Sequence, residues 1–163
     1  MLKKLLFFIA IIIAANSCTR DDLCSAAKQT TSKLVIQFKN FENPSENKGF
    51  TSLSVITDLG DVIVVNDSTT SLITIPLFVR ADITSYRFIK DINDTITINV
   101  DSISFNYRRV DEYLNRACSF KTIFYDVNAL VVPEDITTNW IRSIEIVNDT
   151  IENENEAHIN IFH

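Results

Sequence analysis

The chain has 163 residues, with 15 lysines and arginines against 21 aspartates and glutamates, and a formal net charge of −6 at pH 7. An acidic chain without a basic block is a poor partner for nucleic acid or for anionic lipid headgroups. Its only two glycines, Gly49 and Gly60, are too few for a glycine-rich loop that would cradle a phosphate.

The segment 1–17 has the layout of a secretory signal peptide. Lys3 and Lys4 precede an uninterrupted apolar run over 5–15, which is shorter than the roughly 20 residues that a bilayer span needs. The run ends in small residues before Cys18, and this "AANSC" resembles the bacterial lipobox. We therefore expect residues 1–17 to be removed and Cys18 to carry the lipid. An ordinary signal peptide with a chance cysteine is the alternative.

Two cysteines remain if Cys18 is lipidated, namely Cys24 and Cys118. Export would place them where disulfides persist, so we predict a Cys24–Cys118 bond, with two buried free thiols as the alternative. The bond would close a loop of about 95 residues. It would leave a short tether over 18–32 and a single domain over 33–163.

The domain is expected to be built from short strands. Apolar and polar residues alternate with a period of two, and β-branched and aromatic residues are frequent. The expected strands are 33–38, 52–57, 61–65, 71–79, 84–90, 94–100, 102–108, 119–127, 140–147 and 157–162. This pattern predicts an all-β fold, a single β-sandwich of immunoglobulin-like or transthyretin-like type, with a small barrel as the alternative.

Two local features qualify that pattern. Pro76 cannot donate a ladder hydrogen bond, which places 71–79 at an edge or a bulge. The segment 109–117 fits a short helix or a strand equally well, because Val110 and Leu114 would share a helix face with Tyr113.

Asn-Asp pairs recur where strands are expected to end, within 65–68, 92–95 and 147–150. Asn and Asp tolerate left-handed backbone and bond to their own chain, so they can replace glycine in tight turns. Calcium binding is the alternative use of their oxygens, but the spacing of a calcium loop is absent.

The inventory of reactive side chains is small. His158 is expected on the solvent face of a last strand, and His163 at a frayed terminus, where neither can act as a rigidly held base. We predict no catalytic, cofactor-binding or metal-binding residue and no enzymatic activity. A cryptic hydrolase using carboxylates such as Asp111 is the minor alternative.

Aromatic residues could instead line a groove for a small ligand or a glycan, with Trp140 and the polar loop 40–50 as candidates. Core packing is the commoner fate of alternating aromatics, and we favour it here. The aromatics concerned are Phe38, Phe105, Tyr107, Phe120, Phe124 and Trp140.

Three segments together resemble a known family. They are "CTRDDLC" at 18–24, "YLNRACSFKTIFY" at 113–125 and the closing "NDTIENENEAHINIF". The sequence resembles an uncharacterised family of Bacteroidota lipoproteins, domain of unknown function 6452, over essentially the whole mature chain. The resemblance implies an outer-membrane location, facing the periplasm or the cell surface. It also implies pairing with an outer-membrane β-barrel protein.

Two further expectations follow from that lineage. Arg20-Asp21-Asp22 resembles a signal for display on the cell surface, with a solvated tether as the alternative. The triplets that begin at Asp94, Asp101 and Asp149 resemble the phylum's O-glycosylation pattern, so the candidate acceptors are Thr95, Ser102 and Thr150. Glycans at such sites would cover and solubilise the surface.

Overall fold

The structure is a computed structural model, and it describes residues 24, 30–133 and 139–163. Nine strands and no helix form this part of the chain. The strands are β1 (Leu34–Lys39), β2 (Leu53–Thr57), β3 (Ile63–Ser68), β4 (Leu72–Ile75), β5 (Ile83–Lys90), β6 (Asn99–Asn115), β7 (Ser119–Val131), β8 (Ser143–Ile146) and β9 (Ile159–Phe162). The all-β prediction is confirmed.

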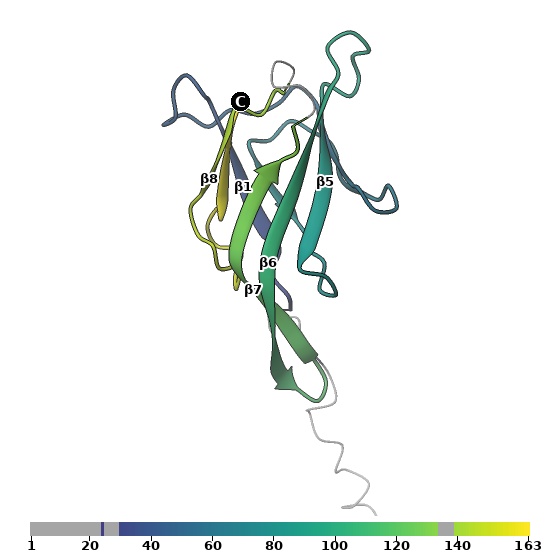
Figure 1. Cartoon of the computed structure of the whole chain (residues 1–163), viewed down its shortest axis with the longest axis vertical. Coiled ribbons are helices and arrows are strands. Elements are labelled where there is room, and N and C mark those ends of the chain that lie inside the picture. Colours follow the sequence, from purple (N-terminus) through teal and green to yellow (C-terminus); the bar gives the residue numbers. More distant parts are fainter. Residues whose placement is uncertain (1–23, 25–29, 134–138) are drawn as a thin grey trace, which may run out of the picture.

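The strands form two sheets rather than a barrel, one with the order β4-β1-β9-β8 and the other with the order β3-β2-β5-β6-β7. Figure 1 shows the two sheets packed face to face as a sandwich. All neighbours are antiparallel except β1 and β9, which run parallel with Phe38 opposite Ile161. The first and last strands therefore lie side by side at the centre of the four-stranded sheet.

The core lies between the two sheets and follows the alternation in the sequence. On β1, Leu34, Ile36 and Phe38 are fully buried, as the period of two predicts. The facing sheet contributes the inner rows of β2, β5 and β6. These rows include Leu53, Val55, Tyr86, Phe88, Ile103, Phe105 and Tyr107. Full burial of each large apolar side chain stabilises the fold by roughly 1.5–3 kcal/mol.

One strand replaces two expected ones. The segment 94–98 is a turn rather than a strand, and β6 begins at Asn99 and continues without interruption to Asn115. The segment 109–115 is therefore a strand, and the alternative prediction of a helix over 109–117 is wrong. The reason is tertiary, because β7 pairs with β6 along this whole stretch, from Ile103↔Val131 to Asn115↔Ser119.

Pro76 and the Asn-Asp pairs lie largely where their chemistry predicts. Pro76 directly follows β4, which is an edge strand, as expected. Asp67 has a left-handed backbone with a φ of 47°. The other two Asn-Asp pairs bond to their own chain instead, since Asp94 Oδ1 accepts from the Ile96 amide and Asn148 Oδ1 from the Thr150 amide, at 2.8 and 2.9 Å.

Candidate functional site: the disulfide-linked hairpin

The β6–β7 hairpin is the most prominent feature of the molecule. Its strands have 17 and 13 residues, whereas β1, β8 and β9 of the opposite sheet have six, four and four. Figure 1 shows the hairpin extending well beyond the sandwich at its lower end. The far half of the hairpin therefore has no opposite sheet to pack against.

Successive residues of one β7 face show where the core ends. Phe124 is fully buried beside Ile151, with which it exchanges backbone hydrogen bonds of 3.3 and 2.8 Å. Thr122, two residues nearer the tip, is 6% exposed, and its amide donates to Thr31 Oγ1. Phe120, two residues further, is 60% exposed. The prediction that Phe120 packs in the core is therefore wrong, because the opposite sheet does not reach that level.

Phe120 forms an exposed aromatic pair with Tyr113. The two residues are direct cross-strand partners, with ring centroids 5.3 Å apart in an edge-to-face arrangement. Tyr113 is 58% exposed. Next to them, Lys121 Nζ lies 3.1 Å from the Glu112 carboxylate, so a cross-strand ion pair lies beside the aromatic pair. Sequence periodicity could not identify this pair, because an exposed aromatic and a core aromatic have the same alternation.

A disulfide links the N-terminal tether to this hairpin. Cys24 and Cys118 are bonded across a sequence separation of 94 residues, with their Cα atoms 4.8 Å apart, in agreement with the predicted pairing. Two hydrogen bonds hold the end of the tether along the body, from the Thr122 amide to Thr31 Oγ1 and from Ser32 Oγ to the Glu152 carbonyl. Thr31 and Ser32, just before β1, therefore lie against β7 and the residues around Glu152.

The predicted lipidation site itself, Cys18, lies outside the described residues. The same holds for the signal peptide 1–17 and for Arg20-Asp21-Asp22. These stay predictions from sequence.

The three candidate glycosylation residues have different environments. Thr95 is exposed in the turn before β6, and Thr150 is half-buried directly before Ile151. Ser102 does not lie between strands as expected. It is a half-buried residue inside β6, opposite Arg87 of β5, because the two expected strands around it are one.

The two histidines are buried, against expectation. His158 is 3% exposed, and its Nδ1 accepts from the Val35 amide at 3.1 Å. His163 is 9% exposed and does not fray, because its ring stacks on Phe50 at 4.4 Å and meets Trp140 edge-on at 5.6 Å. The loop residue Lys48 adds a bond from Nζ to the His163 carbonyl at 2.9 Å. The closing residues therefore belong to the core.

Trp140 is part of the same cluster. It is 7% exposed and makes an edge-on contact with Phe50 at 5.4 Å, so the prediction of core packing is confirmed for this residue. Phe38, Phe105, Tyr107 and Phe124 are also in the core. A buried Trp140 offers no flat face to a ligand.

Both histidines predict a pH dependence of stability. Burial lowers the pKa of His163 to about 4 and lowers the pKa of His158, so both are neutral in the fold, whereas they take up protons near pH 6.5 when unfolded. The unfolded chain then binds more protons than the native one below pH 6.5. We expect the neutral histidines to make their whole contribution to the free energy of unfolding above that pH. The free energy of unfolding should then fall as the pH drops towards 4.

Urea unfolding gives the free energy of unfolding at each pH. Measurements in steps of about one unit between about pH 7.5 and pH 4.5 test this expectation. The variant His163→Phe keeps an aromatic ring against Phe50 but removes the titrating group, so its pH dependence should be shallower. An identical slope in the variant and the wild type would show that His163 does not contribute.

The side chains considered for metal binding or catalysis lie apart in the described residues. No group of three or more His, Cys, Asp or Glu among them is arranged to hold a metal ion. Asp111 lies on β6 and accepts from Thr122 Oγ1 at 2.7 Å, while His158 lies beside β1 of the other sheet. Within residues 24, 30–133 and 139–163, no helix has the length and hydropathy to cross a bilayer.

Comparison with known proteins gives one match. A family model described as a family of unknown function (DUF6452) matches residues 52–163, which include the whole β6–β7 hairpin, Trp140 and His163 but neither β1 nor the segment 18–24. No curated protein and no solved structure matches the chain.

Proposed function

We propose that this chain, which belongs to the family of unknown function DUF6452, is an outer-membrane-anchored lipoprotein without enzymatic activity. In this proposal it acts as an accessory or binding module for another envelope protein, with an outer-membrane β-barrel protein as the expected partner. The lineage among Bacteroidota lipoproteins is part of the proposal.

The observation that carries the proposal is the disulfide at the hairpin tip. A cysteine pair that bonds across 94 residues fits an exported protein, because disulfides persist outside the reducing cytoplasm. Export also agrees with the predicted signal peptide over 1–17. The bonded Cys24 lies six residues after Cys18, the residue that we expect to carry the lipid.

The fold has two ends, and the lipid anchor that we propose at Cys18 would lie near the hairpin end and leave the opposite end free. The chain enters β1 beside the hairpin, where Thr31 bonds Thr122, and β1 and β9 then run in parallel away from it. The loop 40–50, the turn 91–98 and the C-terminus follow at the opposite end (Figure 1). A partner is therefore expected to bind at this free end or along the sandwich edges.

The free end offers both polar and backbone groups. A hollow of about 300 Å³ there is lined by Thr51, Ser52, Asp91, Asn93, Asp94 and Thr97. Three edge strands could also accept a partner strand, namely β3 in one sheet and β4 and β8 in the other. The fourth edge strand, β7, already bonds Thr31, Asp149 and Ile151 through its outward amides. A stable complex would need a buried area of about 1,200 Å² or more.

The proposal is tested by a crosslinked pull-down of the tagged full chain from detergent-extracted envelopes of its own host. The matched control is Cys18→Ala, which removes the proposed anchor and leaves residues 24–163 unchanged. We expect one integral envelope protein to co-purify with the wild type and to be lost from the control. Recovery of the wild type alone, as a monomer in extracts that retain their barrel proteins, would contradict the accessory function.

A further inference from the structure

We infer that the tip of the β6–β7 hairpin contacts the lipid bilayer, with Tyr113 and Phe120 lying at the level of the headgroups. The inference rests on the proposed lipid anchor at Cys18 and adds a second contact with the same membrane. It assigns a function to the one exposed aromatic pair that the described part of the chain presents.

The aromatic pair has the character of an interfacial contact. Tyr113 and Phe120 are 58% and 60% exposed although their rings touch, so each ring presents an open face to the surroundings. Tyrosine combines an apolar ring with a polar hydroxyl, and aromatic rings with a polar end are enriched where membrane meets water. An exposed aromatic pair at the end of a narrow projection could enter the headgroup layer without moving the body of the domain.

The tether limits which surface can meet the membrane. Cys24 lies six positions after Cys18, and a chain segment of that length spans at most about 20 Å. The disulfide fixes Cys24 to Cys118, which lies two residues from Phe120. Lipid on Cys18 therefore holds the aromatic pair near the bilayer.

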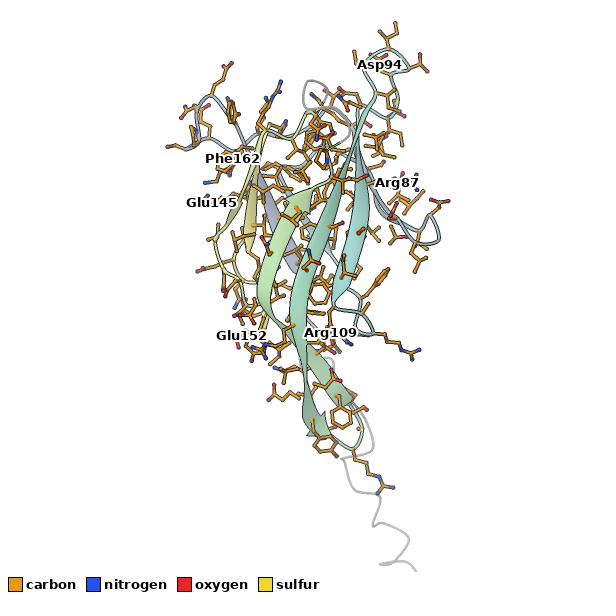
Figure 2. The ribbon with its side chains drawn as sticks, viewed as in Figure 1. Arg87, Asp94, Arg109, Glu145, Glu152 and Phe162 are labelled. Atoms are coloured by element: carbon orange, nitrogen blue, oxygen red, sulfur yellow. A yellow bond between two sulfur atoms is a disulfide. The ribbon has the colours of Figure 1, made fainter. Side chains whose placement is uncertain are left out.

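The opposite end of the domain is out of reach. β6 has 17 residues between the turn that holds Ile96 and the hairpin tip, and a strand of that length spans roughly 50 Å. Figure 2 shows Asp94 of that turn at one extreme of the molecule and the hairpin at the other, with Arg109 partway between them. An anchor at Cys18 thus favours contact of the bilayer with the hairpin tip rather than with any loop of the free end.

Charge favours the same orientation. The whole chain carries −6, but the tip segment 112–121 has Arg116 and Lys121 against Glu112, which gives +2 − 1 = +1. Arg116 is exposed between the strands of the hairpin. Because anionic headgroups repel an acidic body and attract cations, the tip can approach them without the repulsion that the whole chain would meet.

The test places a photoreactive benzoylphenylalanine at position 120 of the full lipidated chain, reconstituted in vesicles of phosphatidylethanolamine and phosphatidylglycerol. The matched control carries the same group at position 96, where Ile96 is 90% exposed in the turn before β6. After irradiation, mass spectrometry of the peptides should find lipid adducts at position 120 and none above background at position 96. A second probe at position 113, on the partner ring, guards against a defect particular to position 120.

Flotation of the same samples distinguishes a failure of the hairpin contact from a failure of the proposed lipid anchor. A chain that floats with the vesicles but gives no lipid adduct at position 120 or 113 overturns the hairpin contact and leaves the anchor standing. Adducts of equal yield at positions 120 and 96 also overturn it, because the domain would then have no fixed orientation. A chain that neither floats nor carries lipid on Cys18 overturns the proposed anchor and the hairpin contact with it.

Discussion

Replacement of Cys24 and Cys118 by serine is expected to lower the free energy of unfolding by about 4–5 kcal/mol. The disulfide closes a loop with a sequence separation of 94 residues, and its loss frees the unfolded chain to explore many more conformations. Urea unfolding followed by the fluorescence of the buried Trp140 measures the change, with Cys18→Ser in every variant to keep the protein unlipidated. The urea dependence should also steepen, because the unfolded state becomes more expanded.

The single variants provide the control for this result. The bond needs both sulfurs, so Cys24→Ser and Cys118→Ser should each destabilise the chain about as much as the double variant does. Additive losses, or a loss below about 1 kcal/mol in the double variant, would show that the tether is not held by this bond in the folded protein.

The substitution Ile161→Ala is expected to cost about 2–5 kcal/mol of unfolding free energy. Ile161 is fully buried on β9, opposite Phe38 of β1 and Ile144 of β8, so its loss leaves a cavity at the centre of the four-stranded sheet. A C-terminus that frayed inward from His163, where the sequence predicts fraying, would tolerate the change. The experiment therefore asks directly whether the closing strand is part of the core.

The matched control is the same substitution on an edge strand. Ile63 of β3 is 56% exposed, and Ile63→Ala should change the unfolding free energy by no more than about 0.5 kcal/mol. Equal losses from the two variants would contradict the placement of β9 between β1 and β8.

A membrane-contacting hairpin would also explain why the longest strands of the domain extend beyond their sheet. The far half of β6 and β7 buries little apolar surface, and Phe120 is exposed where Phe124 is not. A contact with the bilayer on one side and a partner at the free end on the other would place the sandwich between two binding surfaces. Both proposals can be tested on the same purified full-length chain.

Local residue chemistry determined much of this protein. The period of two is a property of the strand itself, so the buried row Leu34, Ile36 and Phe38 could be read directly from the sequence. The Cys24–Cys118 pair followed from counting the cysteines of a chain that we expect to be exported. Both inferences depend on neighbours along the chain or on the compartment, not on how distant segments meet.

The tertiary structure alone decided the rest. His158 and His163 are buried because the last strand pairs with the first across more than a hundred residues of sequence, and no local pattern reports that pairing. The segment 109–115 is a strand because β7 lies beside it, and weak propensity gives way to such pairing. Phe120 and Phe124 have the same residue type and share one face of β7. The reach of the opposite sheet makes Phe124 part of the core and leaves Phe120 as a surface contact.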